Sequence, residues 1–206
     1  MHAPEQLVPP FSSPAWLYEI KHDGYRCMAG IEPGAIGDPA RVHLRTKVGA
    51  NCTGWFPEVV RALAALAGGP HIIDGEACVL REDGTSDFNL LQERARKRRW
   101  YAGAPSVTLC AFDLLVHDGI DLMERTLVER KEALTHLLAG LPKTAVLLVG
   151  DLPADADLFK AMVEAGIRIE GVMAKRKDST YEPGLRSPAW RKVKRAGWQE
   201  GRIWKG

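Results

Sequence analysis

The sequence has no Cys-x-x-Cys pair, and its four cysteines, Cys27, Cys52, Cys78 and Cys110, are far apart along the chain. Closely spaced cysteine pairs are the usual mark of a zinc site, and a high density of cysteines in a short secreted chain marks a disulfide framework. The sequence therefore argues against both kinds of site and favours a protein that works in a reducing compartment.

Long apolar runs are also missing, and the chain does not open on a charged segment followed by an apolar one. A membrane-spanning helix needs about 20 apolar residues in a row, and a secretory signal needs that opening pattern. These absences predict a soluble, cytoplasmic protein. The net charge is only +2, so any affinity for nucleic acid must come from local clusters of positive charge.

The chain does contain enough hydrophobic residues, 46% of its 206, to bury one substantial core or one domain made of two lobes. Four prolines within residues 1–14 predict an extended N-terminal arm. Capping residues, turn residues and apolar stripes predict the helices. These helices are expected to begin near Pro57, after Ser86 or Asp87, after Thr126, and after Asp155 or Asp157.

The most informative stretch is residues 16–26, Trp-Leu-Tyr-Glu-Ile-Lys-His-Asp-Gly-Tyr-Arg. Alternation along a strand places Glu19 and Lys21 on one surface, just before a turn at Asp23 and Gly24, where glycine permits a tight backbone. A lysine fixed at a strand end among charged groups is a candidate covalent nucleophile. A lone Lys-x-Asp-Gly could equally be a surface hairpin, but the full run Glu-x-Lys-x-Asp-Gly-x-Arg is far more specific.

This run resembles the active-site motif of the covalent nucleotidyltransferases, which include ATP-dependent DNA ligases, RNA ligases and mRNA capping enzymes. In that family the lysine attacks the α-phosphate of a nucleoside triphosphate, forms a lysyl-nucleotide and releases pyrophosphate. The resemblance implies that Lys21 is the nucleophile and that Glu19 and Arg26 lie at the bound nucleotide. It also implies an α+β fold, in which two antiparallel β-sheets flanked by helices hold the nucleotide in the cleft between them.

Three further positions resemble family motifs in the expected order. The string Asp-Gly-Glu ending at Glu76 matches a motif whose glutamate contacts the ribose or a metal. Asp74 falls on the same strand face, and two acids in an apolar strand are costly unless cations or hydroxyls meet them; an edge strand with its acids in water is the alternative. Phe112 would stack on the purine, although core packing is the usual role of such an aromatic. Lys47 stands where the family has arginine, so it keeps the charge but loses the bidentate fork.

Two motifs near the end of the chain complete the resemblance. The string Glu-Gly-Val-Met-Ala-Lys from Glu170 to Lys175 implies a metal ligand at Glu170 and a group facing phosphates or DNA at Lys175. Strand alternation puts Lys192 and Lys194 on one face, where they repel each other unless an anion lies between them. The resemblance thus implies ATP as the nucleotide, Lys192 and Lys194 as phosphate-binding groups, and Mg²⁺ at Glu170 and Glu76.

A dense basic run follows the predicted helix start after Ser86 or Asp87. Its members are Arg94, Arg96, Lys97, Arg98 and Arg99. Such a run is often a solvated helix face, and the competing interpretation is contact with the phosphate backbone of DNA. Neighbouring strings also resemble the ligase domains that bacteria use in end joining, which favours nicked or broken DNA as the partner.

Residues 15–195 are therefore expected to form the adenylation domain of an ATP-dependent DNA ligase. In this hypothesis ATP adenylates Lys21, and AMP then passes to the 5′-phosphate at a DNA nick for sealing, in DNA repair or recombination. Residues 196–206 are predicted to be a tail too short for the OB-fold domain that usually follows, and a separate OB-fold or end-joining protein is a predicted partner. The alternatives are an RNA ligase, a capping guanylyltransferase, or a non-catalytic module that binds nucleotide or DNA.

Overall fold

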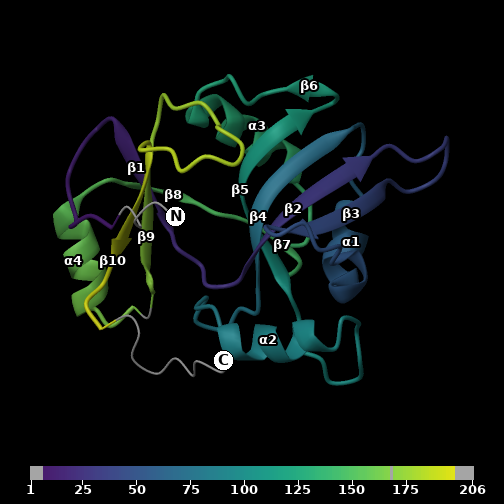
Figure 1. Cartoon of the computed structure of the whole chain (residues 1–206), viewed down its shortest axis with the longest axis horizontal. Coiled ribbons are helices and arrows are strands. Elements are labelled where there is room, and N and C mark those ends of the chain that lie inside the picture. The colour runs from purple at the N-terminus through teal and green to yellow at the C-terminus, as the bar shows by residue number, and fades with distance from the viewer. Residues whose placement is uncertain (1–6, 168, 198–206) are drawn as a thin grey trace.

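Two β-sheets form the protein, and helices lie on their outer sides (Figure 1). The structure is a computed structural model that describes residues 7–167 and 169–197. None of the helices in these two ranges is long and apolar enough to cross a membrane. The predicted α+β architecture with two sheets is confirmed.

The smaller sheet has the strand order β10–β9–β1–β8, and every neighbouring pair is antiparallel. Its strands are β1 (Trp16–Ile20), β8 (Asp151–Pro153), β9 (Gly171–Arg176) and β10 (Trp190–Lys194). One face packs Tyr18 and Val172 under helix α4 (Ala156–Glu164). Asp155 caps this helix by accepting a hydrogen bond from the backbone N–H of Leu158, one of the two predicted starts.

The larger sheet has the order β3–β2–β4–β5–β6, and β7 pairs with β5. Its strands are β2 (Tyr25–Glu32), β3 (Arg41–Thr46), β4 (His71–Cys78), β5 (Thr108–His117), β6 (Ile120–Asp121) and β7 (Val146–Leu148). All of these pairs are antiparallel except β5–β7, which is parallel. Beside Asp74 the register of β5 shifts so that Phe112 has no partner on β4, which marks it as the extra residue of a β-bulge.

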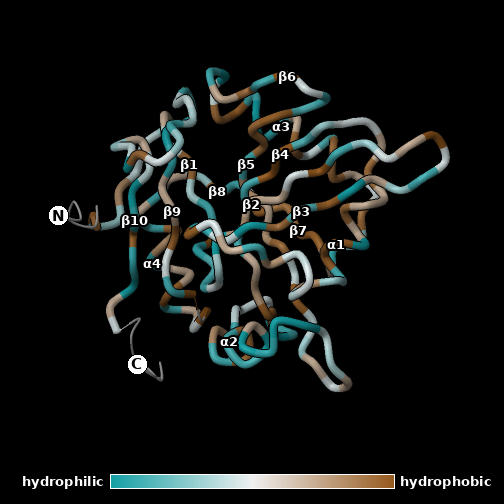
Figure 2. The backbone as a smooth tube through the Cα atoms, turned by 45° about the vertical axis from the view of Figure 1, so that its right-hand side comes forward, coloured by the Kyte–Doolittle hydropathy of each residue, from teal (hydrophilic) through white to brown (hydrophobic). Residues whose placement is uncertain are grey.

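Three helices pack on the larger sheet and close its core. They are α1 (Pro57–Leu63), which follows the short 3₁₀ turn η1 (Thr53–Trp55), α2 (Phe88–Arg96) and α3 (Leu127–Leu138). Their predicted starts are confirmed, because Pro57 begins α1, Asp87 caps α2 and Thr126 opens a capping box with Glu129. Figure 2 shows hydrophobic residues running through the strands of this sheet, while α2 is largely hydrophilic.

The described part of the predicted N-terminal arm runs along the smaller sheet. Leu7 forms a parallel bridge with Lys192, and the ring of Phe11 meets those of Trp16 and Tyr18 edge-on at centroid distances of 5.4 and 5.7 Å. Residues 1–6 of the arm and 198–206 of the predicted tail lie outside the described residues.

Candidate active-site cleft

A cleft of about 760 Å³ lies between the two sheets, a size typical of small-molecule sites. Both sheets contribute to its lining, which includes Glu19, Lys21, Arg26, Lys47, Glu76, Arg96, Arg98, Cys110, Phe112, Lys175, Trp190 and Lys192. Lys21 follows β1 of the smaller sheet and precedes β2 of the larger one. The candidate nucleophile therefore lies on the segment that joins the two walls of the cleft.

Lys21 is held from its backbone and from its amine. Its N–H donates to the carbonyl oxygen of Gly171 at 3.0 Å, and its Nζ donates to Glu170 Oε2 at 2.7 Å. Lys194 Nζ lies 3.1 Å from the other oxygen of Glu170. The structure thus brings together three predicted site residues from three motifs. The Glu170 carboxylate lies between the amines of Lys21 and Lys194.

The glycine of the predicted turn is required by a close approach of two strands. A Cβ at Gly24 would lie 2.2 Å from the carbonyl oxygen of Ala77 and 2.8 Å from Cys78 Sγ. The backbone N–H of Asp23 donates to the hydroxyl of Ser86 at 2.8 Å. These contacts fix the turn after Lys21 against the end of β4.

Glu19 lies at the floor of the cleft between two lysines. Its carboxylate is 2.5 Å from Lys131 Nζ and 2.6 Å from Lys175 Nζ, and all three side chains are buried. Burial alone would lower the pKa of Lys131, but Glu19 and Asp151 outweigh it and raise that pKa. For Lys175 burial prevails and lowers the pKa despite Glu19.

The amine of Lys175 is also enclosed by aromatic rings. Lys175 Nζ lies 4.4 Å from the ring centroid of Phe112 and 4.1 Å from that of Trp190, within the range of cation–π contacts. The bulge at Phe112 turns this ring toward the cleft, as its predicted role requires. Lys175 lines the cleft as Phe112 does. The contacts of Phe112 and Lys175 with a nucleotide remain predictions.

Asp74 is fully buried and meets both a cation and a hydroxyl. Arg26 Nε and Nη2 donate to its two oxygens at 3.1 and 2.6 Å, and the Tyr181 hydroxyl donates to Oδ2 at 2.8 Å. Burial alone would lower the pKa of Arg26, but the charges and hydrogen bonds of Asp74 and Tyr181 together outweigh it and raise that pKa. The expectation that acids in this strand need such partners is confirmed for Asp74. The edge-strand alternative is wrong, because β4 lies between β2 and β5.

Glu76 is the second acid of β4 and is half-buried at the cleft. Burial raises its pKa to about 7, and the positive charges of Lys21 and Arg26 lower it by less. A carboxylate in this environment is stabilised as an anion when a further cation binds. Together with Glu170 it offers oxygen ligands, which are the donors that Mg²⁺ prefers, so the residues fit the predicted metal.

The basic run at the end of α2 divides into buried and exposed residues. Arg94 is fully buried, and donates to the carbonyl oxygen of Arg99 at 2.5 Å and to Glu58 Oε2 at 3.3 Å. The prediction that Arg94 binds DNA is therefore wrong, because α2 turns this side chain into the core. The other four predicted residues are exposed: Arg96, Lys97, Arg98 and Arg99. Of these, Arg96 and Arg98 line the cleft.

The sequence matches the family model for the ATP-dependent DNA ligase domain over residues 1–194. This chain belongs to that family. This chain is 33% identical over 209 residues to the multifunctional non-homologous end joining protein LigD of Mycolicibacterium smegmatis. The aligned region covers 98% of this chain and 25% of that protein. LigD of Pseudomonas aeruginosa is 36% identical over 180 residues, or 87% of this chain and 20% of that protein. The ligase domain thus spans about a quarter or less of these curated relatives.

Solved structures show the same fold. The ligase domain of M. tuberculosis LigD matches with a TM-score of 0.72 at 32% identity, over 93% of this chain and 60% of that one. A mycobacterial DNA ligase D complexed with ATP and MES matches with a TM-score of 0.67 at 30% identity, over 92% of this chain and 60% of that one. The predicted nucleotidyltransferase fold is therefore confirmed.

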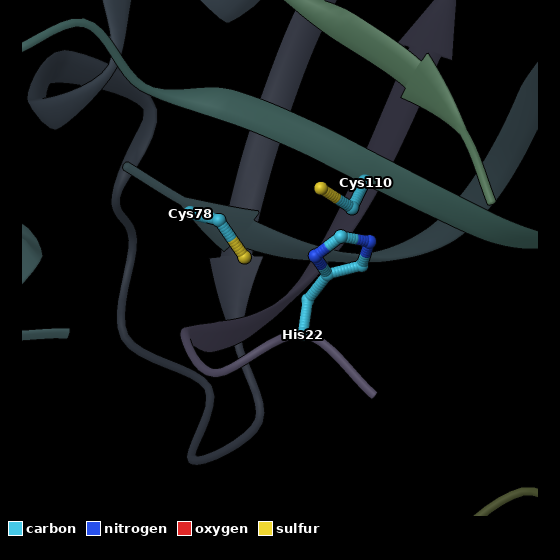
Figure 3. Close-up of side chains that lie close together, drawn as sticks. All are labelled: His22, Cys78 and Cys110. Carbon is cyan, nitrogen blue, oxygen red and sulfur yellow. The ribbon is translucent and has the colours of Figure 1, made fainter. Parts of the chain in front are cut away.

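Two features of the cleft escaped the sequence analysis. Lys131 was not among the predicted site residues, although a lysine in the buried stripe of α3 is a signal that could have been followed. The wide spacing of the cysteines argued against a metal site, yet strand pairing brings Cys78 and Cys110 together beside His22 (Figure 3). Sequence distance carries no information about such pairing, so this second feature had no local signal.

Proposed function

We propose that this domain is the adenylation domain of an ATP-dependent DNA ligase. It transfers AMP from ATP to Lys21, and then from Lys21 to the 5′-phosphate at a break in DNA, where a 3′-hydroxyl displaces AMP and seals the strand. The observation that carries the proposal is the position of Lys21 Nζ, at the junction of the two cleft walls and 2.7 Å from Glu170. Membership of the ligase family supports the choice of chemistry.

The first step joins Lys21 to the α-phosphorus. A P–N bond forms, the bond from that phosphorus to the pyrophosphate oxygen breaks, and the attacking amine gives up its proton. Glu170, which accepts the hydrogen bond of Lys21, is placed to take a proton from the ammonium form before attack. Lys47 and Lys192 line the same cleft and would stabilise the negative charge of the leaving pyrophosphate.

The predicted Mg²⁺ would be held by Glu170 and Glu76, whose carboxylates suit it. When bound, it would neutralise charge on the triphosphate and compete with Lys21 for Glu170. The aromatic side of the cleft, with Phe112 and Trp190, offers a surface for the adenine ring. Arg26 is aligned by Asp74 beside these rings and would contact the nucleotide from there.

DNA is the proposed second substrate because the relatives are DNA ligases and end joining proteins by name. The exposed basic residues at the end of α2, Arg96 to Arg99, would contact its phosphates. A separate OB-fold or end-joining protein stays a proposed partner. Its addition is expected to raise both the rate of formation of the Lys21 adduct and the affinity for nicked DNA.

Intact mass spectrometry after incubation with Mg²⁺ and ATP tests the first step, with GTP in a parallel reaction. We expect one AMP to be added with ATP, nothing to be added with GTP, and no adduct in Lys21→Arg, which keeps the charge but not the nucleophile. A GMP adduct would indicate a capping guanylyltransferase, and an adduct that survives Lys21→Arg would exclude Lys21.

The second step requires a different readout. Purified AMP-bound protein is mixed with nicked DNA and, separately, with a nicked RNA duplex, and the appearance of the adenylated 5′-end and of the sealed strand is followed on a gel. We expect transfer to DNA. Preferential transfer to RNA would establish an RNA ligase, and an AMP adduct that transfers to neither would leave a nucleotide-binding module.

A further inference from the structure

Three soft donor side chains meet beside Lys21. His22 follows Lys21 in the turn between the sheets, Cys78 is the last residue of β4, and Cys110 lies in β5. Their ligand atoms all lie within 4.8 Å of one another. Figure 3 shows the two sulfurs and the imidazole ring gathered around one point.

Strand pairing and the tight turn explain why these residues meet. Cys110 is directly opposite Glu76 on β4, so that Cys78, two residues further along β4, lies on the same face as Cys110. Gly24 allows the turn to approach β4 so closely that an added Cβ would meet Cys78 Sγ at 2.8 Å. This approach brings His22 to the two sulfurs.

The cluster is built as a pocket with an entry. Both cysteines are fully buried and free, and apolar side chains such as Val149 pack around them. His22 and Cys110 line the nucleotide cleft, so an ion can reach the sulfurs from that side.

We propose that His22, Cys78 and Cys110 bind one Zn²⁺ ion, with the fourth position directed toward the cleft. Zinc bonds of about 2.3 Å to sulfur place two sulfurs of a tetrahedral site roughly 3.8 Å apart. The ligand atoms need to close by about 1 Å at most from their present 4.8 Å limit. Binding releases the thiol protons to solvent.

The donor type separates this ion from the catalytic metal. Mg²⁺ takes oxygen ligands, such as Glu170 and Glu76, and competes poorly for two sulfurs and a nitrogen. The zinc ion would connect the turn after Lys21 to β4 and β5 of the larger sheet. It would thereby fix the backbone next to the nucleophile and raise the thermal stability of the protein.

Two other groupings in the described part of the chain serve as controls. Cys27 and Cys52 have their sulfurs 3.7 Å apart, but they lie in the core of the larger sheet and no histidine joins them in a metal-ligating group. His71 lies near His117 and Asp118, but its Nε2 contacts the Ala67 carbonyl and its Nδ1 accepts from the Asp118 N–H. The ring nitrogens of His71 are therefore already used.

Titration of the reduced, metal-free full chain with Co²⁺ tests the proposal without any measurement of ligase activity. Two thiolate ligands give a charge-transfer band in the near ultraviolet, and a tetrahedral site gives strong visible bands. We expect both to saturate at one Co²⁺ per chain and to disappear when Zn²⁺ is added. Zinc content after dialysis, measured by elemental analysis, should likewise approach one ion per chain.

The variants locate the site. His22→Ala, on the half-exposed turn, should weaken Co²⁺ binding by about 100-fold or more, and Cys78→Ala and Cys110→Ala should remove the charge-transfer band. Cys27→Ala and His117→Ala should leave the spectrum unchanged. The proposal is overturned if wild type shows no thiolate band, or if the band survives His22→Ala with unchanged affinity or is lost in Cys27→Ala. Circular dichroism of each variant separates loss of ligation from loss of folding.

Discussion

Glu19 and Glu170 each lie between two lysines, and the two clusters differ in the exposure of those lysines. Around Glu19, both Lys131 and Lys175 are almost completely buried, with side-chain exposures of 6% and 1%. Glu19 contacts both amines, and Asp151, 2.8 Å from Lys131 Nζ, supplies a second carboxylate to the cluster. Because removal of one partner from such a cluster leaves uncompensated charge, its role is to hold α3, β1 and β9 together.

Around Glu170 the same residue types have a different surrounding. Lys21 is 19% exposed and lines the cleft, and Lys194 approaches from β10. Glu170 itself is only 5% exposed, so the group of this cluster that a ligand in the cleft meets first is the amine of Lys21. Composition therefore does not distinguish the two clusters, whereas the exposure of one lysine does.

The largest predicted effect is on stability, and it comes from the buried cluster. Glu19→Gln keeps the shape of the side chain but leaves Lys131 and Lys175 without its charge. We expect the free energy of unfolding to fall by about 3–5 kcal/mol, measured by urea denaturation. Glu170→Gln is the matched comparison and should cost less, because Lys21 remains partly hydrated and only Lys194 is left as a buried amine. Equal losses in the two variants would refute the distinction between the clusters.

The next effect is on the rate of adduct formation, and here Glu170→Gln, the milder change for stability, is expected to have the larger effect. Glu170→Gln should slow the formation of the AMP adduct on Lys21 by about 100-fold, because it removes both the proposed proton acceptor and a proposed metal ligand. The rate is followed by quenched-flow labelling with saturating ATP. If Glu170→Gln reacts at the wild-type rate, Glu170 is a structural partner of Lys194 and has no part in the first step.

Much of this site was predictable because strand alternation and motif order are local properties. Lys21, Glu170 and Lys194 were all identified from the sequence, and so was the need of Asp74 for a cationic or hydroxyl partner. The identity of the partner was not predictable, since Tyr181 reaches Asp74 from a loop 107 positions away. The same holds for Lys131 at Glu19, where helix packing rather than a motif decides the contact.

The helix starts were predictable for a related reason. Capping at Asp87 and Thr126 depends on residues within one turn of the helix, and the structure has both caps. The inward direction of the Arg94 side chain was not predictable, because the sequence of a basic run is the same whether or not one of its members is buried. A buried arginine requires an acid and a carbonyl oxygen at the right places, here from Glu58 and Arg99, and these positions follow from the tertiary structure.

Glu76 offers a third comparison, an acid at the same cleft whose pKa burial raises to about 7. Since the folded state holds its proton more tightly than the unfolded state, the associated stability is complete below pH 4.5, the ordinary pKa, and is lost as the pH rises through 7. We expect Glu76→Gln to gain about 3 kcal/mol over wild type at about pH 8 and almost nothing at about pH 4.5.

Urea denaturation at several pH values between these limits measures that difference. Added Mg²⁺ should reduce it at the higher pH, because a bound cation stabilises the ionised carboxylate of the wild type. A gain that is the same at every pH would show that the change acts through packing and not through the charge of Glu76.

The smallest predicted effect extends the contrast between buried and accessible charge to the basic residues. Arg98→Ala should weaken DNA binding by about 1 kcal/mol and lower the slope of log affinity against log salt by about 0.9, because one phosphate contact is lost. Arg94→Met should leave this slope unchanged but lower stability, since Arg94 is fully buried against Glu58. Fluorescence anisotropy on a nicked duplex across a salt series provides both slopes. If the two variants change the slope equally, exposure does not decide which arginines of this run meet DNA.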